Sequence, residues 1–329
     1  MTERENVLKV YRHEKPEWTP IWMQAVQSVG LWAGNECGLR GERVQENIAL
    51  DVFGVEWQMD HGTPMPALGK FLLEDICDWR EVVKFPEPKT WDWEMLASVE
   101  LKDRDPNKAL TYFCEQGLWD RLVQLMGFES AAMALLTDPE ECDAFFSRVA
   151  DYKIELIECV AKYIKPDIFM YTDDVAKSDS LFMHPDTYRK LIKPHHARII
   201  KAIKDNGMIP EQHTCGKCEA IIDDYVEIGI ECFFPAQSSN DLVAIQKKHG
   251  KKMCLNGGFD SQGPAGYEDA SEETTRAEAR RMANEYAVNG GFIALPMIGD
   301  PVTPPTPSQA FRMMTFFDEF RKECNKLGI

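Results

Sequence analysis

A carboxylate, an imidazole and two thiols lie close together in the segment 211–218, EQHTCGKC. This segment is typical of a short buried strand that runs into a glycine turn. Because side chains alternate along a strand, we expect Glu211, His213 and Cys215 to point to the same side. Such side chains bind zinc, and Cys218, one helical turn further on, would add a second thiolate. The segment predicts a zinc site, and a zinc with one coordination position left open would be catalytic.

Carboxylates also follow two other predicted strands. Asp173 and Asp174 come after the apolar run 167–171, and Asp260 comes after a pair of glycines. Neighbouring side chains on a strand face opposite sides, so at most one of Asp173 and Asp174 should point into a site; the other would cap a helix or pair with a lysine. We expect Asp173 and Asp260 to contact substrate. Asp174 and Glu211 are the candidate catalytic acids.

The elements that position these residues follow a regular alternation. Strands of five to seven residues alternate with longer helical segments, which predicts parallel pairing through βαβ units. No glycine-rich dinucleotide fingerprint follows any strand, so a closed (β/α)8 TIM barrel is favoured over a doubly wound sheet. We expect one domain, 1–329, with a short N-terminal helical extension. Strands are predicted at 19–24, 110–114, 167–171, 208–215, 231–235, 252–258 and 291–296.

Three other stretches complete this interpretation. Residues 35–50 predict a helix, whereas the polar, proline-dotted region 51–92 gives no clear pattern. The pair His195-His196 lies in a long helix with a basic face, so we expect it to pack or to be solvated on the outside of the barrel. The polar ends of the strands should meet at the carboxyl-terminal rim, where barrel active sites form.

Composition narrows the class of protein. The 329 residues are 44% hydrophobic, with a net charge of -17 that opposes binding to the phosphates of nucleic acids. The ten cysteines are scattered, which indicates free thiols in a reducing compartment. No apolar run is long enough to span a membrane, and the amino terminus does not resemble a secretion signal. We expect a cytoplasmic protein whose partner is a small molecule or another protein.

Several segments together point to one family: 2–8, PIWM at 20–23, DVFGVEW at 51–57, Asp173-Asp174, His213-x-Cys215-Gly216, 240–242 and 256–260. In these segments the chain resembles the uroporphyrinogen decarboxylase superfamily, which implies a (β/α)8 barrel. The decarboxylases of that superfamily carry arginines after the first strand to hold porphyrinogen carboxylates, whereas the segment 23–30 here has none. Decarboxylation is therefore disfavoured.

The other branch of the superfamily contains zinc-dependent methyltransferases that work with corrinoid proteins. Its thiol-methylating members have a His-x-Cys pair and a distant cysteine near the last strand, but 290–292 supplies no thiol here. The segment 51–57 is more similar to the methyltransferases of O-demethylase systems. This resemblance implies a methoxylated aromatic substrate, a separate corrinoid (cobalamin) protein as methyl acceptor, and zinc as Lewis acid.

In such an enzyme Trp22, Met23 and Gln24 would bind substrate, and aromatic residues such as Trp57, Phe182 and Phe234 would line the pocket. His213 and Cys215 are the first two metal ligands. For the remaining ligands, Cys218 competes with Glu211 and with an acid such as Asp174 or Asp260. Two alternatives stay open: methyl transfer from a methylcorrinoid protein to a thiol or tetrahydrofolate, and a non-catalytic barrel that binds a corrinoid protein.

Overall fold

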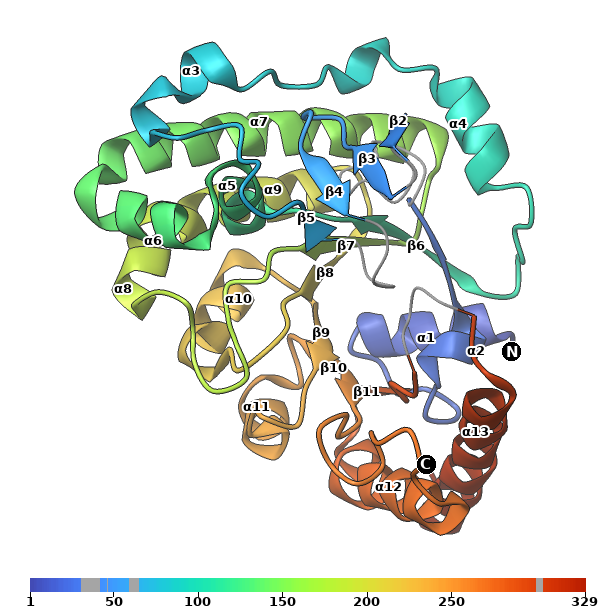
Figure 1. Ribbon diagram of the computed structural model, residues 1–329. Helices are drawn as coiled ribbons and strands as arrows, with labels where there is room; N and C mark the ends of the chain where they lie inside the picture. The colour runs from blue at the N-terminus through green and yellow to red at the C-terminus, as the bar shows by residue number, and fades with distance from the viewer. Residues whose placement is uncertain (31–41, 46, 59–64, 300–303) are drawn as a thin grey trace.

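A curled sheet of seven parallel strands forms the centre of the protein (Figure 1). The computed structural model describes residues 1–30, 42–45, 47–58, 65–299 and 304–329. The strand order is β1-β6-β7-β8-β9-β10-β11, and every pair is parallel. The strands are β1 (Val26–Val29), β6 (Ala109–Cys114), β7 (Ile168–Thr172), β8 (Ile209–His213), β9 (Cys232–Ala236), β10 (Cys254–Gly258) and β11 (Phe292–Leu295).

The first and last parts of this sheet also meet. Ile21 forms a parallel bridge with Ala294 of β11, and the Ala294 N–H donates to the carbonyl of Pro20 at 3.0 Å. A short helix, α2 (Trp22–Ala25), separates this bridge from β1. The predicted TIM-barrel-like α/β fold with an N-terminal helix is therefore confirmed, with a single bridge in place of an eighth strand among the described residues.

Two of the predicted elements are wrong. The strand expected at 19–24 is the bridge at Ile21 followed by the helical turn α2, because an apolar run this short does not distinguish strand from helix. The helix expected at 35–50 is contradicted at its carboxyl-terminal end, where β2 and β3 pair antiparallel. Residues 31–41 and 46 of that predicted helix lie outside the described residues.

These two strands belong to a second, four-stranded antiparallel sheet, with order β2-β3-β4-β5. The turn between β3 and β4 is held by Asp51, whose Oδ1 accepts from the N–H groups of Phe53 and Val55 at 2.8 and 2.9 Å. Its Oδ2 accepts from Arg121 Nη1 at 2.6 Å, and both side chains are almost completely buried. The strands are β2 (Glu42–Gln45), β3 (Ile48–Leu50), β4 (Glu56–Gln58) and β5 (Met65–Pro66).

Helices cover the outer side of the parallel sheet, as Figure 1 shows for α5, α7, α9 and α10 to α13. Within the described residues, no helix is long and apolar enough to cross a membrane. The α-helices are α1 (Glu3–Tyr11), α2 (Trp22–Ala25), α3 (Trp79–Val82), α4 (Trp93–Glu100), α5 (Leu118–Met126), α6 (Phe128–Thr137), α7 (Pro139–Tyr163), α8 (Pro185–Thr187), α9 (Lys193–Asp205), α10 (Ile222–Ile228), α11 (Leu242–His249), α12 (Glu272–Glu285) and α13 (Pro307–Leu327). A π-helical turn, Tyr188–Ile192, joins α8 to α9, and short 3-10 turns lie at Ile76–Asp78, Pro88–Thr90, Glu219–Ile221 and Ala287–Asn289.

The inward-facing side chains of the sheet form successive layers. At the amino-terminal end, α1 packs on the first residues of the strands, an apolar layer that contains Val26, Ala109, Ile168, Cys232 and Cys254. The next layer is polar and contains the buried side chains of Thr111, Glu211 and Asn256. An aromatic and apolar layer lies at the carboxyl-terminal end, with Trp22, Phe113, Met170, Phe234, Leu295 and Met297. The layers show that this end of the barrel presents an apolar floor to whatever binds there.

Candidate metal centre

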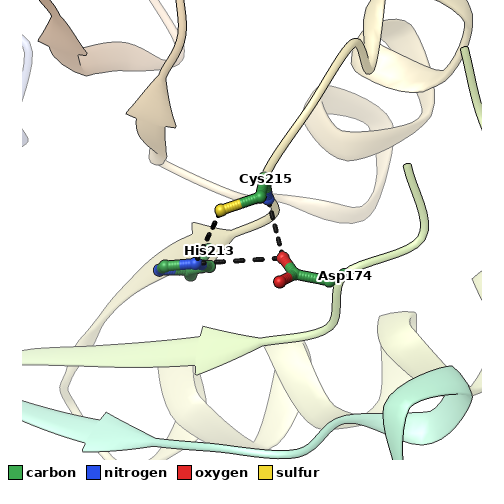
Figure 2. Close-up of side chains that lie close together, drawn as sticks. All are labelled: Asp174, His213 and Cys215. Carbon is green, nitrogen blue, oxygen red and sulfur yellow. Dashed lines mark hydrogen bonds and ion pairs between the residues drawn. The ribbon is translucent and has the colours of Figure 1, made fainter. Parts of the chain in front are cut away.

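Three side chains that could hold a metal ion converge at the carboxyl-terminal end of the barrel (Figure 2). His213 is the last residue of β8, Cys215 follows two residues later, and Asp174 follows the end of β7. Cys215 Sγ lies 3.5 Å from His213 Nε2, which lies 3.8 Å from Asp174 Oδ1. The Cys215 N–H donates to Asp174 Oδ1 at 2.7 Å, so the carboxylate is held between the other two residues.

The geometry of this group fits zinc. Bonds of roughly 2.3 Å to sulfur and 2.0–2.1 Å to nitrogen, at a tetrahedral angle, put the two ligand atoms about 3.5 Å apart. The observed distance between Cys215 Sγ and His213 Nε2 is the same. One potential ligand atom from each of Asp174, His213 and Cys215 lies within 4.8 Å of the others. Three protein ligands leave a fourth position for substrate, as in catalytic zinc sites.

Burial controls the protonation of His213 and Cys215. The pKa of His213 is lowered, chiefly because burial disfavours the imidazolium, and Asp174 opposes this effect in part. Burial, with smaller contributions from the carboxylates of Asp174 and Asp120, raises the pKa of the Cys215 thiol to about 12. The imidazole is therefore a neutral ligand, whereas the thiol ionises only when a cation compensates its charge.

The turn after β8 is built around Gly216. Its φ of +92° is in the left-handed region, and a Cβ at this position would lie 2.4 Å from the carbonyl oxygen of Lys177. The Gly216 N–H donates to Gln237 Oε1 at 2.6 Å, and the Lys217 N–H donates to the Lys177 carbonyl at 2.8 Å. These contacts tie the turn to the loops after β7 and β9, so the positions of the ligands depend on three neighbouring strands.

Cys218, the predicted third ligand, lies apart from this group. Its side chain is fully buried, and Sγ faces backbone carbonyl oxygens, with that of Gly216 at 3.7 Å. Burial also raises the pKa of this thiol well above its ordinary value. The structure brings Asp174, and not Cys218, together with His213 and Cys215.

Glu211 faces the inside of the barrel, as predicted, but one layer deeper. Its Oε1 accepts from Tyr11 Oη and Asn256 Nδ2, both at 2.9 Å, and from Cys232 Sγ at 3.2 Å. It is fully buried, and burial raises its pKa. The Glu211 carboxyl group therefore belongs to the polar layer below the candidate metal ligands. This position does not fit the predicted role of Glu211 as an acid in contact with substrate.

Asp173 and Asp174 face opposite sides, as the alternation predicted. The Asp173 carboxylate is fully buried, and accepts from the N–H groups of Leu118, Trp119 and Asp120 at the start of α5. It therefore caps α5, and contact with substrate does not fit this position. Asp260 is partly exposed at the end of β10, where Oδ1 accepts from Ser238 Oγ at 3.1 Å and from the N–H of Gly263 at 3.0 Å, and contact with substrate stays a prediction.

The segment around α2 is divided between two environments. The Trp22 ring packs against Phe234, with centroids 5.7 Å apart, and its Nε1 is buried with no hydrogen-bond partner among the described residues. Met23 and Gln24 instead precede β1: the Met23 carbonyl accepts from Lys108 Nζ, and Gln24 Oε1 accepts from Arg321. Met23 and Gln24 lie at the amino-terminal side of β1, and this position does not fit contact with substrate. They were expected at the carboxyl end of a strand over 19–24, but the strand begins only at Val26.

Aromatic residues surround His213. The ring centroids of Phe234 and Phe113 lie 5.2 and 5.9 Å from that of the imidazole. Phe234 was expected in the pocket, whereas Phe113 was not singled out, although its place near the end of a predicted strand was a usable signal. Trp57 and Phe182, also expected there, lie elsewhere in the described structure: Trp57 Nε1 donates to Asp51 at 3.1 Å, and Phe182 packs on Phe128 of α6.

Asp120 is a further acidic residue that the sequence analysis missed. It lies in the first turn of α5, and its Oδ2 accepts from the Asp174 N–H at 3.0 Å. Burial and the charges of Asp173 and Asp174 raise its pKa well above the ordinary value. No local pattern distinguished Asp120 from other acids at helix starts; only the packing of α5 against the end of β7 places it beside the site.

Comparisons with known proteins agree with this architecture. Residues 47–319 match the family model described as uroporphyrinogen decarboxylase (URO-D). Among solved structures, a methyltransferase from Methanosarcina mazei is similar, with a TM-score of 0.67 and 16% identity over 97% of this chain and 99% of that one. At this identity the likeness shows the fold alone. No curated protein matches the sequence.

Two further solved structures are less similar. One is a putative sugar phosphate isomerase/epimerase from Anabaena variabilis, with a TM-score of 0.42 and 10% identity over 71% of this chain and 81% of that one. The other is a pneumococcal exo-β-D-N-acetylglucosaminidase with GH20 catalytic modules, with a TM-score of 0.44 and 13% identity over 98% of this chain and 81% of that one.

Proposed function

The chain belongs to the uroporphyrinogen decarboxylase family, and from this premise we propose that it is a zinc-dependent methyltransferase. It cleaves the methyl ether of a methoxylated aromatic compound and transfers the methyl group to the Co(I) centre of a separate corrinoid protein. The observation that carries the proposal is the group formed by Asp174, His213 and Cys215 at the carboxyl-terminal end of the barrel. Its ligand set and spacing suit a zinc ion with an open position.

The surroundings of this group suit a flat aromatic substrate. Phe113, Phe234 and Trp22 provide apolar faces next to His213. Trp22 Nε1 is a buried donor without a partner in the described structure, and it could bind an oxygen substituent of the ring. A pocket of this kind would accept a methoxyarene and would not hold a polyanionic tetrapyrrole, since segment 23–30 contains no arginine.

The reaction breaks the bond between the methyl carbon and the ether oxygen, and both electrons of that bond stay on the oxygen. Zinc, when bound, supplies a Lewis acid that stabilises the negative charge on this leaving oxygen. Asp174, His213 and Cys215 would hold the metal, and the aromatic walls would orient the ring. The methyl group forms a new bond to cobalt with the electron pair of Co(I), and the phenolate takes a proton from solvent.

A demethylation assay tests this function. Purified protein is mixed with methoxylated aromatics and a corrinoid protein reduced to Co(I), and methyl-cobalt formation is followed by absorbance. We expect turnover that is lost in His213→Ala and after treatment with a chelator, and that is kept in the control His249→Ala, whose ring pairs with Asp223 of α10 at 2.7 Å. A metal content far below one zinc per chain together with chelator-resistant activity would refute the zinc-dependent mechanism.

The same assay separates the alternatives. Turnover with free methylcobalamin and a thiol, without demethylation, would favour methyl transfer in the opposite direction. A demethylation rate unchanged in His213→Ala would favour a barrel that binds a corrinoid protein without using this site for catalysis.

A further inference from the structure

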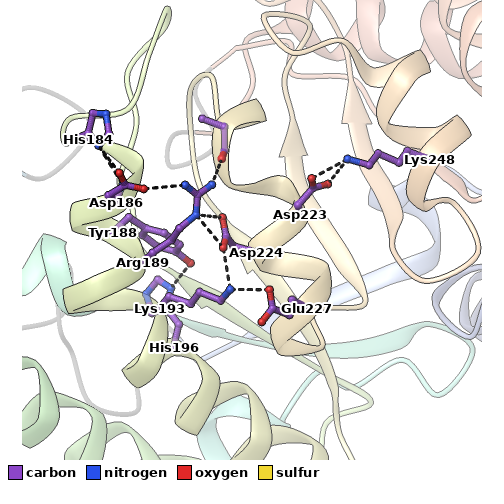
Figure 3. Close-up of polar contacts among 11 residues, drawn as sticks. His184, Asp186, Tyr188, Arg189, Lys193, His196, Asp223, Asp224, Glu227 and Lys248 are labelled. Atoms are coloured by element: carbon purple, nitrogen blue, oxygen red, sulfur yellow. Dashed lines mark hydrogen bonds and ion pairs between the residues drawn. The ribbon is translucent and has the colours of Figure 1, made fainter.

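A chain of buried side chains leads from the outer helix α9 to the metal centre. His196 lies on α9, and its Nε2 is 2.7 Å from Asp173 Oδ2, while its Nδ1 is 3.2 Å from Tyr188 Oη. Figure 3 shows the contact between Tyr188 and His196. All three side chains are fully buried. A histidine in the first turns of an outer helix thus contacts the residue next to the ligand Asp174.

The direction of these hydrogen bonds follows from their partners. An ionised carboxylate only accepts, so the proton between His196 and Asp173 is on Nε2. In the tautomer that carries its only ring proton on Nε2, Nδ1 is an acceptor for the O–H of Tyr188. Tyr188 begins the π-helical turn Tyr188–Ile192, a type of turn that is frequent at functional sites. Next to it, Arg189 pairs with Asp224 of α10, which anchors this turn (Figure 3).

Asp173 is also fixed from the side of α5. Its carboxylate accepts three N–H groups from the first turn of α5, between 3.0 and 3.3 Å. A Cβ on Gly117, the residue before α5, would lie 2.4 Å from Cβ and Cγ of Asp173, so the close approach requires glycine. His196 therefore adds a fourth contact to this carboxylate, at the Oδ2 atom that also accepts from Leu118 and Trp119.

The backbone of Asp173 is bound to the residues that carry the ligands. Its N–H donates to the carbonyl of His213 at 3.0 Å, and its carbonyl accepts from Thr214 Oγ1 at 2.8 Å. The next residue, Asp174, donates its N–H to Asp120 of α5 at 3.0 Å. A movement of Asp173 would shift Asp174 directly and would shift His213 through β8.

We propose that His196 is a positioning residue of the metal centre: through Asp173 it holds Asp174 and His213 in the arrangement that binds the ion. This inference rests on the proposed metal site. The partners that orient metal ligands typically contribute 10–100-fold in metal affinity. Because His196 acts through Asp173 and does not contact the ligands itself, we expect a contribution at the lower end of this range, about tenfold.

The test compares two neighbouring histidines of α9. His196→Leu removes the donor to Asp173, whereas His195→Leu is a matched control, because His195 contacts Asp143 at 2.9 Å and not the site. Zinc affinity is measured by competition with a chromophoric chelator, and ligand geometry by the visible spectrum of the Co(II)-substituted protein. We expect zinc affinity about tenfold weaker and an altered Co(II) spectrum in His196→Leu, with the control within about twofold of the original protein.

A conservative variant covers the case in which His196→Leu does not fold. His196→Gln keeps an N–H donor, and Tyr188→Phe removes only the hydroxyl that contacts His196. For both variants we expect a smaller loss of zinc affinity than in His196→Leu. The control His195→Leu should keep the melting temperature of the original protein. Wild-type zinc affinity and an unchanged Co(II) spectrum in the folded His196 variants would overturn the inference. A wild-type protein that binds no zinc would instead overturn the proposed metal centre, so the two failures are distinguishable.

Discussion

The affinity for zinc should rise with pH, because binding must remove a proton from Cys215. Burial raises the pKa of this thiol to about 12. At pH 7 the thiol is roughly five pH units below this pKa, and each unit costs about 1.4 kcal/mol, so its ionisation costs about 7 kcal/mol. Structural zinc sites in zinc-finger peptides bind the ion with apparent free energies on the order of 10–16 kcal/mol at pH 7, so zinc binding is strong enough to compensate a cost of this size. Below the thiol pKa, the proton competes with the metal, so apparent affinity increases about tenfold for each pH unit.

His213 should add little to this dependence. Burial lowers its pKa from the ordinary value of 6.5, so the ring is already neutral over most of the range from pH 6 to 8. The expected change between these two pH values is therefore about 100-fold, from one proton. If Cys218 were a second thiolate ligand, a second proton would be released and the change would approach 10,000-fold.

The measurement is a competition titration at several pH values, corrected for the protonation of the chelator. Calorimetry in buffers with different ionisation enthalpies counts the protons released with each zinc ion. Cys218→Ala is the control that should keep the one-proton dependence, since its Sγ faces carbonyl oxygens, whereas Cys215→Ser should abolish it. A wild-type affinity that changes less than about threefold between pH 6 and 8 would refute the reasoning, because the thiol could not then be the ligand that loses its proton.

Three further outcomes follow from buried groups. Burial raises the pKa of Glu211 in the folded protein, so its favourable contribution to the free energy of unfolding is complete below the unfolded-state pKa and is lost as pH rises through the folded-state pKa. Glu211→Gln should therefore be more stable than the original protein in urea unfolding at pH 8. An equal loss of stability at all pH values would contradict this. The Gln amide can also donate to Asn256 Oδ1, which has no partner among the described residues. Asp51→Ala removes the carboxylate from the buried Arg121 and should cost about 3–5 kcal/mol in urea unfolding; a change below about 1 kcal/mol would show that the pair is dispensable. Phe234→Ala should raise the KM for a methoxyarene with zinc content unchanged, and an unchanged KM would remove Phe234 from the substrate pocket.

Local sequence patterns predicted which way a side chain points better than how deep in the barrel it lies. Alternation along β8 placed Glu211 and His213 on the same inner face, which the structure confirms. Two residues of a strand span about 6.7 Å, so Glu211 lies a full layer below His213 and bonds to Tyr11 of α1, 200 residues away in sequence. No pattern within 211–218 contains that partner. The strand therefore predicted two of the three candidate ligands, His213 and Cys215, whereas Asp174 was one of four candidates for the remaining positions because it comes from a neighbouring strand.

Cys218 illustrates the complementary case. Helical spacing from Cys215 suggested a common face, but the chain between them passes through the left-handed turn at Gly216 before α10 begins. The turn reverses the backbone, and Sγ of Cys218 faces the carbonyls that the turn exposes. Similarly, the helical turn at Trp22–Ala25 could not be separated from a strand by its apolar content alone. Both cases depend on backbone conformation, which residue spacing does not determine.

The electrostatics of the site give a reason why a cation belongs there. Asp173 and Asp174 raise the pKa of Asp120, and Asp174 and Asp120 in turn raise that of Cys215. Burial is the larger cause of both shifts, and the nearby carboxylates make Asp120 and Cys215 harder still to ionise. A divalent cation would reverse the sign of this interaction and favour the ionised form of the thiol and the acids around it. The acids that add to the raised pKa of Cys215 are thus the same ones that would favour metal binding.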